Sequence, residues 1–176
     1  VHRKIIRKGR CEVVQKQDDF KKALGNYPTG VTVVTTFDKE NHPVGLTVNS
    51  FASVSLDPLL ILWSIDKKSK SLSDFINSGK FAVNILASDQ EKICFLFSSK
   101  EVDRFGQCEW HRSENNLPVL GDVASVLECE TVQQIEAGDH IILIGQVHHI
   151  VNADKAPLLY HQRNVGEIPR TFYQTI

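Results

Sequence analysis

The chain has 176 residues, of which 41% are hydrophobic and 23% charged, and this composition suits one compact domain with a substantial core. Its 20 basic and 21 acidic residues give a net charge of -1, which leaves no broad positive field for nucleic acid or an anionic membrane. The longest apolar run, around residues 59–63, is far shorter than the roughly 20 residues that cross a bilayer. We therefore expect a cytoplasmic protein that binds neither nucleic acid nor a membrane.

The first half of the chain predicts one short helix followed by several strands. Residues 1–16 are charged and only weakly periodic, and we treat them as an N-terminal extension. Asp18 and Asp19 precede apolar residues at helical spacing, which predicts a short helix that ends near Gly25. β-branched and apolar runs predict strands at residues 31–37, 44–48 and 59–65. The first two strands form a hairpin, and the third is a central strand with apolar residues on both faces.

The second half predicts two more short helices and a long hairpin. Helical spacing predicts helices at residues 71–77, closed by Gly79, and at residues 89–98. Strands are expected at residues 80–86, 124–135 and 140–151, and an irregular polar loop at residues 106–117. The last two strands are joined by a short connection that contains Gly138, as in a hairpin. Six or seven strands of this kind favour a mainly β, antiparallel barrel with peripheral short helices at residues 17–166, followed by a tail at residues 167–176.

The motifs of several common enzyme classes are missing from the sequence. There is no G-x-G-x-x-G after a strand, no G-x-x-x-x-G-K-[ST], no H-E-x-x-H and no G-x-S-x-G. The four cysteines are scattered without a C-x-x-C pair, and we assign no metal site. Chemistry carried by a bound cofactor is therefore the natural hypothesis.

Three polar clusters are candidates for binding such a cofactor. Small hydroxyl and amide residues at positions 45–58 follow a strand and offer hydrogen bonds to the edge of a heterocycle, although an ordinary strand end has the same pattern. Residues 64–71 lead from a strand to a helix start and offer groups for a phosphate, or they form a solvated lysine turn capped by Ser69. His140, in Gly138-Asp139-His140 at the tip of the long hairpin, is placed to contact a second ligand or is a turn residue.

Six ordered blocks between about residues 20 and 161 resemble the flavin reductase-like domain family. The blocks are Tyr27-Pro28-Thr29-Gly30-Val31, Thr47-Val48-Asn49-Ser50-Phe51 with Ser53-Val54-Ser55-Leu56-Asp57-Pro58, Ser69-x-Ser71, Phe81-x-Val83-Asn84, Gly138-Asp139-His140 and Pro157-Leu158-Leu159-Tyr160-His161. The resemblance implies an FMN-binding split β-barrel of Greek-key-like topology, assembled as a homodimer with the flavin near the subunit interface. It also implies hydride transfer from NADH or NADPH to FMN or FAD, and an oxygenase partner that receives the reduced flavin.

The same resemblance implies roles for individual residues. His140 is the expected catalytic residue, which orients the nicotinamide over the flavin. The ring is expected at positions 47–50, and the phosphate near Lys67, Ser69 and Ser71, with Arg104 also in reach. The expected cofactor-binding residues are Thr47, Val48, Asn49, Ser50, Ser53, Val54, Ser64, Asp66, Lys67, Ser69, Ser71, Asn84, Arg104, Gly138, Asp139 and Tyr160.

The sequence departs from the family pattern after Tyr160-His161. The family commonly continues there with glycines and an aromatic residue, whereas this chain continues with Gln162-Arg163-Asn164-Val165-Gly166. Two alternatives to a reductase stay open at this stage: a barrel that holds flavin or haem without reducing it, and a structural β-barrel that mediates interactions. The residues also leave open the choices between FMN and FAD and between NADH and NADPH.

Overall fold

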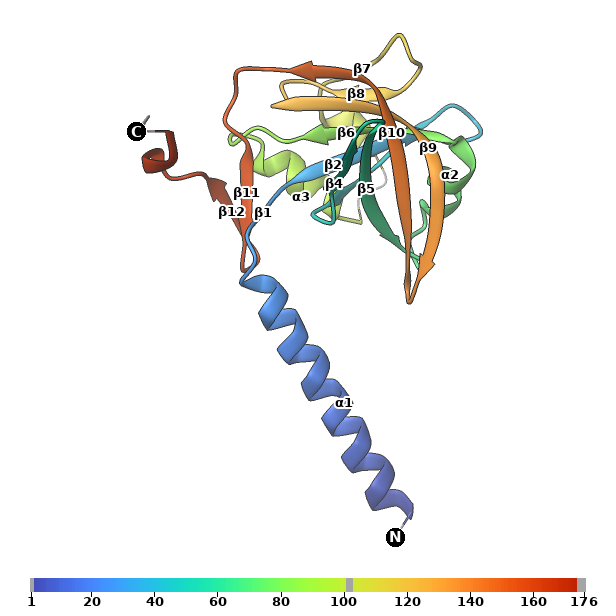
Figure 1. Ribbon diagram of the computed structural model, residues 1–176, viewed down its shortest axis with the longest axis vertical. Helices are drawn as coiled ribbons and strands as arrows, with labels where there is room; N and C mark the ends of the chain where they lie inside the picture. Colours follow the sequence, from blue (N-terminus) through green and yellow to red (C-terminus); the bar gives the residue numbers. More distant parts are fainter. Residues whose placement is uncertain (1, 101–102, 174–176) are drawn as a thin grey trace.

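The computed structural model describes residues 2–100 and 103–173, and the side chains from residue 14 onward. Its centre is a seven-stranded antiparallel sheet in the order β3-β2-β6-β9-β10-β5-β4 (Figure 1). The strands are β2 (Thr32–Phe37), β3 (Pro43–Val48), β4 (Ala52–Leu56), β5 (Leu59–Asp66), β6 (Lys80–Ile85), β9 (Ser125–Ala137) and β10 (His140–Asn152). The edges β3 and β4 are not paired with each other in this sheet, so the barrel is split rather than closed.

Smaller elements surround this sheet. Two short sheets are formed by β7 (Trp110–Arg112) with β8 (Pro118–Leu120), and by β1 (Thr29–Gly30) with β11 (Leu158–His161) and β12 (Asn164–Glu167). The helices are α1 (His2–Gly25), α2 (Leu72–Ser78) and α3 (Glu91–Ser98), with 3-10 turns η1 (Phe105–Gln107) and η2 (Arg170–Tyr173). Figure 1 shows α1 projecting away from the barrel, with the β11–β12 hairpin at its C-terminal end.

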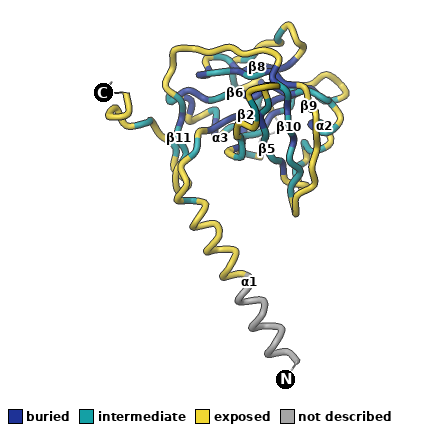
Figure 2. Tube along the Cα trace, viewed as in Figure 1, coloured by how far each residue is buried: buried dark blue, intermediate teal, exposed yellow. Residues whose placement is uncertain are grey.

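The core lies on the inner faces of the main strands and is rich in aromatic side chains. Trp63 on β5 has no appreciable exposure, and its ring centroid lies 5.0 Å from that of Phe75 and 5.6 Å from that of Phe81. A second cluster includes Phe97 on α3 and Phe105 in η1, whose ring centroids are 5.0 Å apart. Edge-to-face contacts of this kind add to the free energy gained by burial. Figure 2 shows the buried segments concentrated in the barrel strands, whereas the described part of α1 is almost entirely exposed.

Several sequence-based expectations are confirmed by this architecture. The fold is mainly β and antiparallel, and the long hairpin is present as β9 and β10. The helix α2 ends at Gly79, which adopts a left-handed conformation with φ of 69°. The expected helix at residues 89–98 is α3, and the expected strands at residues 31–37, 44–48, 59–65 and 80–86 correspond to β2, β3, β5 and β6.

Other expectations were wrong, each for a physical reason. The first helix ends at Gly25 as expected but begins at His2, because good helix formers such as lysine and glutamine carry it through a segment without a clear apolar face. The described residues form twelve strands rather than the expected six or seven. Seven of them make the main sheet, and the smaller sheets use short strands that carry little periodic signal. Residues 106–117 contain η1 and β7 rather than a wholly irregular loop. The division into residues 1–16, 17–166 and 167–176 stays a prediction.

The strand β5 is also less buried than its composition suggests. Ile61, Trp63 and Ile65 are buried on the inner face, whereas Leu60 and Leu62 on the outer face are only half-buried. The expected central position is confirmed, since β5 pairs with β10 on one side and with β4 on the other, although its outer face is only partly covered within one copy of the chain. Its outer face still carries the apolar side chains that led to the prediction.

Candidate functional site

A small cavity lies where β3, α3 and the β11–β12 hairpin meet. Its volume is 220 Å³, and residues from all three elements line it, including Thr47, Asn49, Cys94, Phe95, Tyr160 and Arg163. The elements approach closely because Gly45 on β3 has no side chain. A Cβ at that position would lie 2.7 Å from Cε1 of Phe97 on α3, which is closer than real Cβ contacts allow. The glycine therefore permits the packing that forms one wall of the cavity.

Some polar side chains at this cavity form hydrogen bonds within the protein, and others have no partner and are available to a ligand. The hydroxyl of Thr47 donates a hydrogen bond of 2.8 Å to the carbonyl oxygen of Cys94, which joins β3 to α3. Among the described residues, the side chains of Asn49 and Tyr160 have no hydrogen-bond partner. Val31 and Val165 add apolar wall. Apolar walls with a few convergent polar groups are typical of a site for a small organic ligand.

A larger cavity adjoins the first one. It has a volume of 940 Å³ and extends between the β11–β12 hairpin and the last turns of α1, where Lys21 and Lys22 lie. Asn49, Tyr160 and Arg163 line both cavities, so the two spaces share a wall. The smaller cavity has the more apolar lining, whereas the larger one is lined mainly by polar and charged side chains.

The structure gathers four of the expected cofactor-binding residues at the smaller cavity: Thr47, Val48, Asn49 and Tyr160. Ser50 comes directly after them, and its hydroxyl accepts a hydrogen bond of 3.0 Å from the backbone N–H of Ser64 and donates one of 3.2 Å to the carbonyl of Ser64. These bonds tie the segment after β3 to β5. Ser53 and Val54 lie on the exposed edge strand β4 and line neither cavity.

The remaining polar candidates form a second group at the tip of the β9–β10 hairpin. His140 is paired in register with Asp66 at the end of β5, and the backbone N–H of Lys67 donates a hydrogen bond of 2.9 Å to the carbonyl of Asp139. Nδ1 of His140 lies 2.8 Å from Oδ1 of Asp139, and this hydrogen bond lowers the pKa of the Asp139 carboxyl. The turn between β5 and α2 contains Ser69 and Ser71, and the turn between β9 and β10 contains Gly138. This hairpin-tip cluster lines neither of the two cavities in its own chain.

Two expected residues have structural partners in the interior. Asn84 is fully buried; its amide donates to the carbonyl of Val33 and to the hydroxyl of Thr35, and its oxygen accepts from the N–H of Leu120. The Arg104 guanidinium donates hydrogen bonds of 2.7 Å to the carbonyl of Gly45 and 2.6 Å to that of Ser99. We leave both residues out of the site proposed below, since the Asn84 amide and the two terminal nitrogens of Arg104 already join strands and loops, although the buried Nε of Arg104 has no partner among the described residues.

Sequence reasoning missed the contributions of α1, of α3 and of the part of the β11–β12 hairpin that follows Tyr160. Phe95 and Arg163 line the smaller cavity but come from segments with no recognised ligand motif. The one available signal was that the segment beginning with Gln162 and Arg163 departs from the family pattern. Both residues adopt left-handed conformations, with φ of 49° and 67°, as glycine would.

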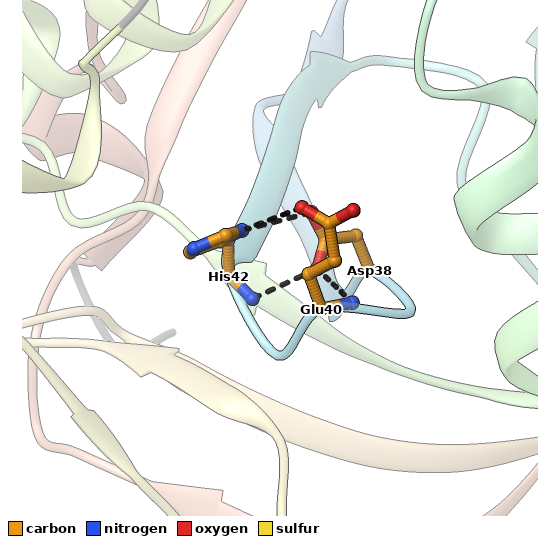
Figure 3. Close-up of side chains that lie close together, drawn as sticks. All are labelled: Asp38, Glu40 and His42. Carbon is orange, nitrogen blue, oxygen red and sulfur yellow. Dashed lines mark hydrogen bonds and ion pairs between the residues drawn. The ribbon is translucent and has the colours of Figure 1, made fainter.

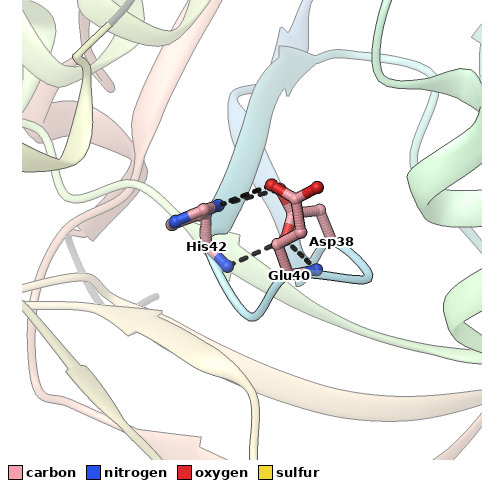
Figure 4. A network of polar contacts seen from close by, with 3 residues as sticks. All are labelled: Asp38, Glu40 and His42. Atoms are coloured by element: carbon pink, nitrogen blue, oxygen red, sulfur yellow. Dashed lines mark hydrogen bonds and ion pairs between the residues drawn. The ribbon is translucent and has the colours of Figure 1, made fainter.

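A cluster of two carboxylates and a histidine was also not foreseen. Asp38, Glu40 and His42 lie together in the exposed β2–β3 turn (Figure 3). Oδ1 of Asp38 accepts hydrogen bonds of 2.8 Å from the backbone N–H groups of both Glu40 and His42, which lowers the pKa of the Asp38 carboxyl (Figure 4). This pattern is a side-chain-capped turn, and it explains why the three groups lie together.

Within the described residues, no helix is both long enough and apolar enough to cross a lipid bilayer. The fold and its cavities define a class: a split antiparallel barrel with a pocket for a small organic ligand at the end of an edge strand.

Comparison with known proteins makes the assignment specific. The model of the family described as flavin reductase like domain matches residues 24–169, and the chain belongs to that family. It is 36% identical over 160 residues to a flavin reductase of Pseudomonas putida, covering 89% of this chain and 94% of the relative. It is 43% identical over 151 residues to the reductase component of a flavin-dependent trigonelline monooxygenase of Acinetobacter baylyi, covering 86% of this chain. The chain spans only 49% of the length of that relative.

Solved structures agree with the fold. The NADH:FAD oxidoreductase SgcE6 of Streptomyces globisporus, in complex with NAD and FAD fragments, aligns with a TM-score of 0.83 and 31% sequence identity. The alignment covers 88% of this chain and 93% of that protein. The expected split-barrel fold is thereby confirmed.

Proposed function

We propose that this chain transfers a hydride from NADH or NADPH to FMN or FAD, and that it serves as the reductase component of a two-component flavin-dependent monooxygenase. The observation that carries the proposal is the cavity at the end of β3, where Thr47, Asn49 and Tyr160 meet apolar side chains. Family membership and the names of the relatives support the same conclusion. The oxygenase that would receive the reduced flavin is inferred from the name of the Acinetobacter relative.

The side chains at the cavity fit a flavin ring. Val31 and Val165 offer apolar contact, Phe95 is half exposed beside them, and Asn49 has free hydrogen-bonding groups for the polar edge of a heterocycle. When bound, nicotinamide supplies the hydride and flavin accepts it, so the chemistry is carried by the cofactors. The protein then needs to hold the two rings in contact and to exclude water, which requires no dedicated acid or base.

The hairpin-tip cluster fits the roles that we assign to its members. We assign the flavin phosphate to Lys67, Ser69 and Ser71, and the nicotinamide to His140, which Asp139 holds in place through a hydrogen bond of 2.8 Å. The exposed Nζ of Lys67 lies 2.9 Å from Oε2 of Glu136. Exposed ion pairs contribute little free energy, so a phosphate can replace the Glu136 carboxylate as the partner of Lys67 at little cost. Because this cluster lines neither cavity of its own chain, we infer that it completes the site of a second copy.

A homodimer also accounts for an apolar surface on the barrel. On the outer face of the sheet, Leu62 pairs with Ile144, and Ile142 pairs with Ile135. Leu62, Ile142 and Ile144 are only half-buried, and Ile135 is exposed. Covering these aliphatic side chains with the same face of a second copy gives a symmetric interface, the commonest arrangement in soluble oligomers.

The dimer is tested by measuring the molar mass of the protein with light scattering as it elutes from a size-exclusion column. Leu62→Asp with Ile142→Asp is expected to give a folded monomer, whereas Val14→Asp, on the exposed part of α1, leaves the dimer intact. A wild-type protein that elutes as a monomer at all concentrations contradicts the proposal. We place the dimer in the cytoplasm, where reduced pyridine nucleotides are available and where its described thiols stay free.

The enzymatic proposal is tested by following the oxidation of NADH and NADPH with and without added FMN or FAD. Oxidation that depends on flavin supports it. If neither donor is oxidised although flavin binds, the protein is a flavin-binding barrel without reductase activity. If no flavin binds and a haem spectrum is obtained instead, the ligand itself has been misassigned.

A further inference from the structure

Three cationic side chains face the larger cavity without a partner. Arg163 comes from the β11–β12 hairpin, and Lys21 and Lys22 come from the last turns of α1. Among the described residues, none of the three makes a hydrogen bond or an ion pair. Asp18 is the acidic residue among the described groups that line this cavity. In a chain whose net charge is -1, this is a local positive site.

Arg163 is held at this place in an unfavourable backbone conformation. Gln162 and Arg163 have φ of 49° and 67°, a region that glycine adopts freely and other residues rarely do. Two bonds fix the turn against the end of α1: the N–H of Gln162 donates to the carbonyl of Gly25 at 3.3 Å, and its amide donates to Oδ1 of Asn26 at 2.9 Å. The chain thus keeps a guanidinium where a glycine would relieve the strain, which points to a function for the side chain.

We propose that Arg163, together with Lys21 and Lys22, binds the adenosine-side phosphate in the diphosphate of an adenine dinucleotide whose reactive ring lies at the smaller cavity. A guanidinium suits this role because its donors match two phosphate oxygens at once. Arg163 lines both cavities, so it lies between the ring end and the polar end of such a ligand. The larger cavity, at 940 Å³, is within the usual range for organic ligands. This inference rests on the proposed function, and FAD and NAD(P)H both contain the diphosphate.

The decisive variant is Arg163→Gly, because it separates binding from folding. Glycine fits the left-handed conformation, so the melting temperature is expected to stay the same or rise. The affinity for the dinucleotide is expected to fall about tenfold, the loss of one charge-assisted contact. Arg163→Lys restores part of the affinity, and Lys39→Ala, in the exposed β2–β3 turn, is the matched charge control. A residue with only a structural role would give neither result.

Four probes distinguish the sources of the diphosphate. FAD and FMN are titrated by flavin fluorescence, and NADH and ADP-ribose by calorimetry. If Arg163→Gly lowers the affinity for FAD but not for FMN, the site binds the flavin dinucleotide. If it lowers the affinity for ADP-ribose and NADH, the site binds the nicotinamide dinucleotide. The double variant Lys21→Ala with Lys22→Ala is expected to weaken the same probe, with a loss that shrinks as salt is added.

Other outcomes overturn the inference. Equal weakening of FMN and FAD in Arg163→Gly means that the cluster holds the flavin phosphate, and unchanged affinity for every probe means that it binds no phosphate. In both cases the wild-type protein still binds flavin, and the proposed function stands. A wild-type protein that binds no flavin at all contradicts the proposed function itself.

Discussion

The hydroxyl of Thr47 donates a hydrogen bond of 2.8 Å to the carbonyl of Cys94, a residue 47 positions further along the chain. This bond joins the end of β3 to α3 at the wall of the smaller cavity. Thr47→Val leaves the partly buried carbonyl without its donor, and we expect a loss of about 1–2 kcal/mol in the free energy of unfolding. Flavin affinity should fall severalfold because the wall is loosened. Thr47→Ser keeps the donor and should preserve both quantities, as measured by urea denaturation and flavin titration.

The close packing of β3 against α3 depends on Gly45. An alanine there places Cβ 2.7 Å from Cε1 of Phe97 and 3.1 Å from Cγ2 of Thr35. We expect Gly45→Ala to destabilise the protein by about 1–3 kcal/mol through overpacking and to weaken flavin binding. Gly30→Ala is the control, since a Cβ at Gly30 meets nothing within 4 Å. Similar melting temperatures for the two variants would show that α3 is not held as closely as the structure indicates.

Different residues of the hairpin-tip cluster should act on different ligands, His140 on the nicotinamide and Ser69 and Ser71 on the flavin phosphate. His140→Ala is expected to slow reduction of flavin by NADH more than it weakens flavin binding. Ser69→Ala with Ser71→Ala is expected to do the reverse, because these hydroxyl groups are assigned to the phosphate. Rapid-mixing kinetics and flavin titration measure the two quantities separately. Parallel changes in both quantities for both variants would refute this division.

The thiol of Cys129 should be inert in the folded protein. Its side chain is buried on β9, and burial raises its pKa from 9.0 to about 12, with the nearby Glu128 adding to the shift. Burial also raises the pKa of the Cys94 and Cys108 thiols. We expect the two buried thiols, Cys94 and Cys129, to react with a thiol reagent at neutral pH only at the rate at which the protein opens, and the half-buried Cys108 to react faster. A Cys11→Ser background removes the one cysteine whose side chain lies outside the described residues.

The same shift predicts how stability depends on pH. The folded state keeps its proton on Cys129 up to about pH 12, whereas the unfolded thiol ionises above about 9.0. The stabilisation is therefore fully present below about pH 9 and is lost as the pH rises toward 12. Cys129→Ala should lose less stability than the wild-type protein over this interval in urea titrations at increasing pH. Equal slopes would mean that the thiol is accessible to water.

The sequence alone predicted the elements that depend on residues close together in the chain. Turn residues and alternating β-branched runs predicted the β2–β3 and β9–β10 hairpins, and Gly79 marked the end of α2. Thr47, Asn49 and Tyr160 were also foreseen as cofactor-binding residues through the resemblance to the family, and the structure gathers them at one cavity. Whether they bind flavin stays a prediction.

What the sequence could not supply depends on contacts between distant segments. Val31, Cys94 and Arg163 meet at the smaller cavity only because β11 pairs with β1 and α3 packs on β3. The strands of the β11–β12 hairpin have only four residues each, too few for a periodic pattern. Likewise, β5 has apolar residues on both faces, yet its outer face is half-exposed in a single copy.

The most direct test of the account is a crystal structure of this chain with bound FMN. We expect the flavin ring in the smaller cavity, against Val31 and Val165 and within hydrogen-bond distance of the segment that carries Thr47 and Asn49. We further expect the phosphate beside Ser69 and Ser71 of a second copy. A ring bound at any other place, with this cavity empty, would contradict the central claim.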